Sequence, residues 1–210
     1  MIIDVWSDVV CPWCFIGKRR LDKAIASLPA GTDVTVRHRA FQLNPAASEV
    51  LPTSQLLAEK YGVGPEQVAA MQANVCSIAD GEGLCYNLEA TESGNTRDAH
   101  RLLLWAGQQD ESAQSALLEA MYSSYFEKAG SLFTREALLA LVVAAGLDAS
   151  AAGVVLDSDD FAQDVQRDQA QAAQLGANGV PFVVIDMKYG ISGAQPQDVF
   201  NQTLAAALAE

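Results

Sequence analysis

The chain has 210 residues, half of them hydrophobic, and a formal net charge of −13. This length suits one domain, or one domain that carries a large insertion, with enough apolar residues for a substantial core. Because phosphate binding needs clustered lysine and arginine, the negative charge disfavours nucleic acid as a partner. No run of apolar residues is long enough for a membrane span, and the first residues do not form a secretory leader, so we expect a cytoplasmic protein.

A β-α-β unit is predicted at the start of the chain. Residues 2–6 are apolar and partly β-branched, which indicates a short buried strand. Residues 12–28 carry apolar side chains at helical spacing, and Pro29 and Gly31 end the pattern. Residues 33–41 alternate in polarity with period two, as a half-buried strand does. If the two strands are parallel, their crossover is expected to be right-handed.

The middle of the chain is predicted to be helical throughout. A polar loop over 42–52 comes first, and residues 53–176 follow with helical patterning interrupted near Gly81 and Gly83. The expected helices cover 53–61, 65–80, a segment capped by Asn95 and Thr96, 111–128, 134–145, 148–156 and 158–175.

Strand patterns return near the C-terminus. Residues 183–185 indicate a buried strand and 188–191 a second one, and a helix is expected from Pro196 to about residue 208. A type I′ turn between these strands needs positive φ at both central positions, which suits Met187 poorly, so another turn type or a longer turn is expected. Together the chain ends supply four strands, which predicts a discontinuous domain of residues 1–50 and 177–210 with an α-helical domain of residues 51–176 inserted.

The motif Cys11-Pro12-Trp13-Cys14 stands directly after the first predicted strand. A cysteine at a helix start meets unpaired amides and the positive end of the helix dipole, and both favour the reactive thiolate. Cys14 lies one turn later on the same face, where it can resolve a mixed disulfide formed at Cys11. Pro12 suits the first helical turn. The pattern therefore favours a redox-active pair, with a structural thiol pair as an alternative.

A zinc site is the other alternative for this pair. It would need two further ligands, but Cys76 and Cys85 are separated by eight residues, and His38 and His100 have no partner at ligand spacing. We therefore predict no metal site.

A second marker is Val180-Pro181, directly before a predicted strand. Proline is tolerated at the first position of a strand, so the pair could have no further meaning. The functional interpretation is a cis-proline opposite the CxxC motif, which leaves the Val180 backbone able to pair with an extended substrate.

With both markers placed, the chain resembles the DsbA-like thioredoxin-fold oxidoreductases, in their FrnE-like branch. The resemblance spans nearly the full length and rests on SDVVCPWCFIGKRRL at 7–21, FQLNP at 41–45, NTRDAHRL at 95–102, GVPFVV at 179–184 and SGAQP at 192–196. It implies an α/β thioredoxin fold, β-α-β followed by β-β-α, with a large α-helical insertion.

The resemblance also implies thiol–disulfide exchange, with Cys11 as nucleophile and Cys14 as resolving thiol. Its partners would be substrate proteins or small thiols and disulfides, with glutathione or the thioredoxin system as electron donor and no tightly bound cofactor. Related 2-hydroxychromene-2-carboxylate isomerases and kappa-class glutathione transferases bind glutathione, which makes glutathione a candidate co-substrate and a glutathione-dependent isomerase or transferase the alternative function. Those relatives typically carry serine at the position of Cys11. A third alternative is a chaperone-like binder that uses an apolar cleft.

The candidate substrate-binding residues lie in the same segments. His100 could line the cleft or be an ordinary core histidine, and Ser192 and Gly193 could hold a glutathione carboxylate or only cap a helix. The full set is Pro12, Trp13, Phe41, Asn44, Asn95, His100, Val180, Pro181, Ser192 and Gly193.

Two features lie outside the family pattern. The CPWC motif lacks a histidine between its cysteines, so we expect a reduction potential of roughly −180 to −270 mV instead of one near −120 mV. Cys76 and Cys85 are either two buried thiols or a second, regulatory disulfide.

Overall fold

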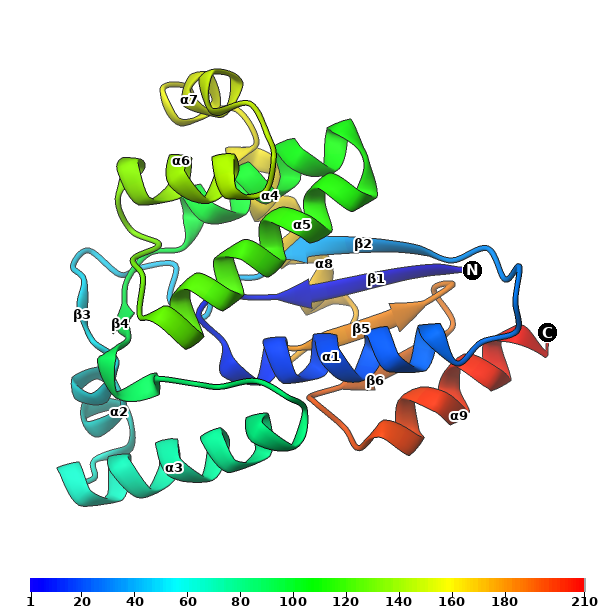
Figure 1. Ribbon diagram of the computed structural model, residues 1–210, viewed down its shortest axis with the longest axis horizontal. Helices are drawn as coiled ribbons and strands as arrows, with labels where there is room; N and C mark the ends of the chain where they lie inside the picture. The colour runs from blue at the N-terminus through cyan, green and yellow to red at the C-terminus, as the bar shows by residue number, and fades with distance from the viewer. Residues whose placement is uncertain (210) are drawn as a thin grey trace.

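The computed structural model describes residues 1–209 (Figure 1). Its strands are β1 (Ile2–Ser7), β2 (Thr35–Ala40), β3 (Leu51–Pro52), β4 (Glu92–Ser93), β5 (Phe182–Ile185) and β6 (Tyr189–Ser192). Its α-helices are α1 (Pro12–Ala26), α2 (Thr53–Tyr61), α3 (Pro65–Gly81), α4 (Arg97–Gln109), α5 (Glu111–Tyr122), α6 (Arg135–Ala144), α7 (Ala149–Leu156), α8 (Ala162–Gln174) and α9 (Gln197–Leu208). A 3₁₀ turn, η1 (Leu88–Ala90), and a π-helical turn, η2 (Ser123–Glu127), complete the secondary structure. Within these described residues, no helix is both long and apolar enough to cross a bilayer.

The main sheet has the strand order β2-β1-β5-β6. β1 and β2 run parallel, as the β-α-β interpretation requires, whereas β5 pairs antiparallel with β1 and β6 pairs antiparallel with β5. The central pair β1–β5 therefore joins the two ends of the chain in one sheet. This arrangement confirms the predicted α/β fold with β-α-β and β-β-α units.

The two faces of the sheet bury alternate residues, because successive side chains of a strand point to opposite sides. Ile3 and Val5 pack with residues of α1 and α9 on one face. Trp6 and Phe182 pack with Ala172 of α8 on the other. Figure 1 shows α1 and α9 on one side of the sheet and α8 on the opposite side.

The outer edge of β2 is covered by helix side chains instead of another strand. The Gln114 side chain of α5 accepts from the His38 N–H at 3.0 Å and donates to the His38 carbonyl at 2.9 Å. Two positions on, the Asp168 carboxylate of α8 accepts from the Ala40 N–H at 2.9 Å. Amides and carbonyls that an edge strand would leave unpaired are thereby satisfied.

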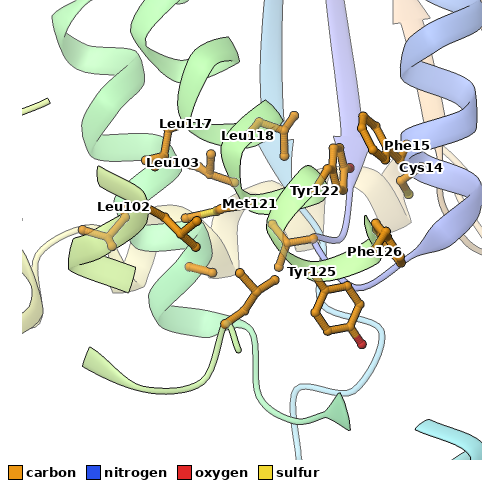
Figure 2. Packing of buried hydrophobic residues seen from close by; sticks show 14 of the residues in the cluster. Cys14, Phe15, Leu102, Leu103, Leu117, Leu118, Met121, Tyr122, Tyr125 and Phe126 are labelled. Carbon is orange, nitrogen blue, oxygen red and sulfur yellow. The ribbon is translucent and has the colours of Figure 1, made fainter. Parts of the chain in front are cut away.

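The largest apolar cluster joins α1 to the helical block. Figure 2 shows Cys14 and Phe15 of α1 meeting Tyr122 and Phe126, which lie at the junction of α5 and η2. The Phe15 ring stacks on the Tyr122 ring with 4.8 Å between centroids. The helix that carries the cysteine pair is therefore fixed by the sheet on one side and by aromatic packing on another.

Some local predictions were wrong, and the first of these concerns the hairpin turn between β5 and β6. Asp186 and Met187 both adopt positive φ, 48° and 56°, and the Lys188 N–H bonds the Ile185 carbonyl at 3.0 Å, so the hairpin does have a two-residue turn of the I′ kind. The Asp186 carboxylate also accepts from the Ile2 N–H at 2.6 Å, which adds a tertiary reason for this geometry.

The second correction concerns the segment expected to be a loop followed only by helices. Leu51–Pro52 and Glu92–Ser93 pair as a small antiparallel sheet, β3–β4, which closes the ends of the α2–α3 region against each other. The helix expected at 158–175 begins only at Ala162, because Phe161 before it takes a left-handed conformation with φ of 63°. The helix expected at 111–128 is α-helical only to Tyr122 and continues as the π-helical turn η2 to Glu127. The remaining helices start and end within a few residues of their predicted bounds.

Candidate active site

The cysteine pair lies at the N-terminus of α1, as the motif predicts. Cys11 is the N-cap residue, and its N–H donates to the Asp8 carbonyl at 3.1 Å. Pro12 occupies the first turn, and the Cys14 N–H donates to the Cys11 carbonyl at 3.0 Å. Neither thiol is in a disulfide and both are buried, with Cys11 4% and Cys14 2% exposed.

The Val180–Pro181 segment lies against the cysteine pair. Its peptide bond is cis, and the Cys11 Sγ donates to the Val180 carbonyl at 3.6 Å. On the next turn of α1, a Cβ added to Gly17 would lie 3.0 Å from the Pro181 Cγ, so a side chain there would crowd the proline. The two sequence markers, far apart in the chain, therefore meet at one place.

Burial governs the protonation state of the Cys14 thiol. Burial raises the pKa of the Cys14 thiol well above its ordinary value, and the hydrogen bond and charge of Cys11 raise it further. Cys14 is therefore held as a neutral thiol in the resting reduced protein.

Asp8 is a buried residue of the site that the sequence interpretation missed. Its carboxylate lies 3.2 Å from the His100 Nε2 and accepts from the Leu43 N–H at 2.7 Å. Both Asp8 and His100 are buried, so of the two interpretations offered for His100 the structure supports the core position. The pair links the CxxC turn to α4 and to the loop after β2.

Tyr86 is the second residue that the sequence did not reveal. Its hydroxyl donates to the Pro12 carbonyl at 2.8 Å, and its ring stacks against Phe126. Burial, followed by the charges of the two site cysteines, raises the pKa of Tyr86. Because the segment around Tyr86 has no periodic pattern, only the fold could place it beside the CxxC turn.

A cavity of about 760 Å³ opens beside Cys11. Five of the predicted site residues line it, namely Cys11, Pro12, Trp13, Asn44 and Val180. Trp13 is half-buried, since it also packs on the aromatic cluster. The far wall comes from α2 and α3, in which no individual site residue was predicted.

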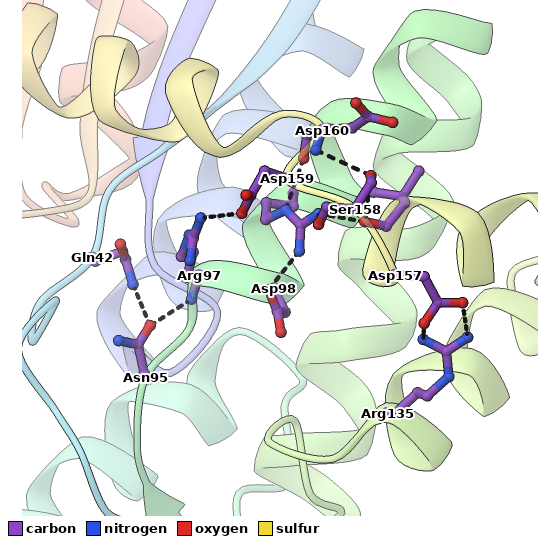
Figure 3. Close-up of polar contacts among 11 residues, drawn as sticks. Gln42, Asn95, Arg97, Asp98, Arg135, Asp157, Ser158, Asp159 and Asp160 are labelled. Atoms are coloured by element: carbon purple, nitrogen blue, oxygen red, sulfur yellow. Dashed lines mark hydrogen bonds and ion pairs between the residues drawn. The ribbon is translucent and has the colours of Figure 1, made fainter.

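The other seven predicted site residues do not line this cavity, and three of them, Cys14, His100 and Pro181, are described above. Phe41 packs with the Trp6 cluster on the α8 face of the sheet. Asn95 bonds Gln42 at 2.8 Å and the Pro45 carbonyl at 3.0 Å, and so holds the loop after β2 against α4 (Figure 3). Ser192 lies at the exposed end of β6, and the Gly193 N–H already donates to the Pro181 carbonyl at 2.8 Å.

The remaining cysteines, Cys76 and Cys85, are more exposed than the two cysteines of the CxxC pair. Cys76 is half-buried and its Sγ donates to the Tyr86 carbonyl at 3.9 Å, whereas Cys85 is exposed. Neither of the two is in a disulfide. The expectation of two buried thiols is therefore wrong for Cys85. Across residues 1–209, no group of three or more histidine, cysteine, aspartate or glutamate side chains is arranged to hold a metal ion.

The geometry of a CxxC helix start against a cis-proline, on a sheet of order β2-β1-β5-β6, defines a thioredoxin-type domain. The model of the DSBA-like thioredoxin domain family matches residues 2–205, and the chain belongs to that family. It is similar to a probable DsbA oxidoreductase of Streptomyces coelicolor, with 43% identity over 100% of this chain and 91% of that chain, and a TM-score of 0.94.

More distant structures share the fold. One is a 2-hydroxychromene-2-carboxylate isomerase, 17% identical over 99% of this chain and 96% of that chain, with a TM-score of 0.70. Another is the cytosolic disulfide reductase DsbM of Pseudomonas aeruginosa, 16% identical over 100% of this chain and 99% of that chain, with a TM-score of 0.69. A second structure of DsbM contains GSH.

Proposed function

We propose that this protein is a thiol–disulfide oxidoreductase in which Cys11 attacks and Cys14 resolves. The Cys11 thiolate attacks one sulfur of a substrate disulfide, forms a mixed disulfide and releases the first substrate thiolate. Cys14 then attacks the Cys11 sulfur and releases the second thiolate. The protein loses two thiol protons to the released thiolates, and two electrons pass from the protein dithiol to the substrate disulfide.

The observation that carries this proposal is the position of Cys11. Its thiol stands at a helix N-terminus, where anions are stabilised, and it also lines the wall of a large cavity. The Val180 backbone stands beside it at 3.6 Å, where an extended substrate segment would be able to pair. Cys14, buried and neutral, is one turn away and suited to attack only after a mixed disulfide has formed at Cys11.

The finer expectations belong to the same proposal. The exchange takes place in the cytoplasm, with glutathione or the thioredoxin system as electron donor. The helices of residues 51–176, inserted between the two parts of the thioredoxin-like domain, choose the substrate, because α2 and α3 build the far wall of the cavity.

The alternative is a glutathione-dependent isomerase or transferase. Such an enzyme needs no second thiol, whereas this chain has both cysteines within one helical turn. A Cys14→Ser variant separates the two activities, since exchange would stop at the mixed disulfide while isomerisation would continue.

Equilibrium titration against glutathione redox buffers tests the proposal. The Cys11–Cys14 couple is expected to titrate as one two-electron couple at roughly −180 to −270 mV, because CPWC lacks the histidine of strongly oxidising motifs. A midpoint near −120 mV would contradict the expected potential, and a pair that cannot be oxidised by any buffer would contradict the function.

A further inference from the structure

The cavity beside Cys11 has a composition that bears on the substrate. Its volume of about 760 Å³ falls within the range of roughly 300–1,000 Å³ that is usual for small-molecule sites. Most of its wall is aliphatic or aromatic, with Leu56, Leu57, Met71 and Val75 on the side of α2 and α3. An apolar group that binds in such a cavity loses contact with water over the surface that meets the wall.

Charge in the cavity is nearly balanced. Among residues 1–209 the charged side chains that line it are Glu59 and Lys60, neighbours of opposite sign. The Lys60 ammonium also lies 5.6 Å from the centre of the Tyr61 ring. A ligand with several carboxylates would meet a single cation beside an anion, on a chain whose net charge is −13.

Two groups outside the cavity that could bind a carboxylate, the Gly193 N–H and the Arg20 guanidinium, already have hydrogen-bond partners. The Gly193 N–H is bonded to the Pro181 carbonyl, and Arg20 is bonded to Glu82 at 2.6 Å and to the Ala194 carbonyl at 2.7 Å. Neither Gly193 nor Arg20 lines the cavity. Neither group is therefore free to bind a carboxylate of a ligand in the cavity, such as one of the two carboxylates of glutathione.

Access to Cys11 limits the size of the substrate. The residue is only 4% exposed, and it borders the cavity, so the disulfide sulfur that Cys11 attacks must enter that space. A disulfide held on the surface of a folded protein brings its surrounding chain with it, whereas a small disulfide brings only its own substituents.

On the basis of the function proposed above, we infer that the substrate is a low-molecular-weight disulfide with a compact, uncharged apolar substituent, and not glutathione disulfide or a folded protein. The substituent lies against the apolar wall of α2 and α3 while its sulfur meets Cys11. The sulfur chemistry is the two-step exchange already described, and the pre-reduced protein supplies both electrons, so a single turnover needs no other reductant.

The test is single-turnover exchange of the reduced full-length protein with matched disulfides. Three symmetric disulfides of N-acetylcysteine amide differ only in the amide substituent, which is benzyl, methyl or carboxymethyl, so the sulfur leaving group stays constant. Glutathione disulfide and insulin represent the charged tripeptide and the protein disulfide. We expect the benzyl compound to have a second-order rate constant about tenfold or more above each of the other four.

A variant pair links this preference to the cavity. Met71→Glu adds a charge to the wall of α3, and Val143→Glu adds the same charge to an exposed position of α6 that does not line the cavity. Both residues are exposed in the wild type, so folding should tolerate either change. The benzyl-to-methyl rate ratio should fall severalfold in Met71→Glu and stay at the wild-type value in Val143→Glu.

Two kinds of result would overturn the inference. Equal rates for the three amides, or faster exchange with glutathione disulfide or insulin, would leave the oxidoreductase function intact and refute the apolar small substrate. A failure of all five disulfides to oxidise the Cys11–Cys14 pair would refute the oxidoreductase function itself.

Discussion

At the scale of single residues, the two cysteines of one short motif differ because of where the fold places them. Cys11 stands at the helix end and borders the cavity, while Cys14 lies a turn deeper beside Phe15 and Tyr122. Asp8 fixes the turn that holds both, through its bonds to His100 and to the Leu43 N–H. The position of Cys11 follows from the sequence, but the Asp8–His100 pair needs the fold.

The raised pKa of Cys14 predicts how stability depends on pH. The folded protein retains the Cys14 proton at pH values above the ordinary thiol pKa of 9.0, whereas the unfolded chain releases it there. The free energy of unfolding of the reduced protein should therefore fall as pH rises past about 9, by up to about 1.4 kcal/mol per pH unit. Urea unfolding between pH 8 and 10 measures this slope, and Cys14→Ala should flatten it. An equal slope in the variant would assign the effect to other groups.

At the scale of elements, β2 shows how helices can take the place of a neighbouring strand. Gln114 bonds both backbone groups of His38, and its Nε2 reaches the Leu103 carbonyl at 3.2 Å. Period-two patterning is enough to predict this strand. It does not reveal which side chains cover the edge, because they come from residues more than 70 positions away.

Replacing Gln114 tests this arrangement. Gln114→Leu would leave the buried His38 N–H and carbonyl without partners, at a cost of about 2–4 kcal/mol in unfolding free energy. Gln55→Leu, on α2, removes a glutamine that bonds only an exposed Glu59 at 3.0 Å, and should change stability by less than about 0.5 kcal/mol. Urea midpoints at constant slope give both values. Equal losses would show that the edge contacts of β2 contribute little.

At the scale of the whole molecule, the position of α3 relative to α1 decides the shape of the cavity. Arg20 and Lys23 of α1 bond Glu82, just after α3, at 2.6 and 2.7 Å. Burial alone would raise the pKa of Glu82, but the hydrogen bonds from Lys23 and Arg20 bring it below its ordinary value. Figure 1 shows α2 and α3 together at one end of the sheet, so this ion-pair cluster anchors the wall they form.

A Glu82→Gln variant should loosen that wall. Amides of α3 are expected to exchange hydrogen severalfold faster, with little change in α9, because the neutral amide holds the two cations less strongly. Asp80→Asn, at an exposed position near the same helix end, is the matched control. Hydrogen exchange followed by mass spectrometry resolves the two helices, and uniform acceleration throughout the chain would point to global destabilisation instead.

These scales explain which predictions succeeded. The strand patterns of β1 and β2, the CxxC helix start and the proline before β5 are all local. The sequence was therefore sufficient to predict them and the fold that they imply. The far wall of the cavity was missed because α2 and α3 carry ordinary apolar residues whose role depends on where Glu82 anchors them. The Asp186–Met187 turn was misjudged because Asp186 is held by the Ile2 amide of another strand.

The most direct test of the central claim is to trap the covalent intermediate at Cys11. Reduced wild type, Cys14→Ser and Cys11→Ser proteins are mixed with equimolar disulfide, quenched with acid within seconds, and mapped by peptide mass spectrometry. We predict an internal Cys11–Cys14 disulfide in the wild type, a stable mixed disulfide on Cys11 in Cys14→Ser, and neither product in Cys11→Ser. A Cys14→Ser protein without an adduct at Cys11, or a Cys11→Ser protein that reacts as fast through Cys14, would contradict the account.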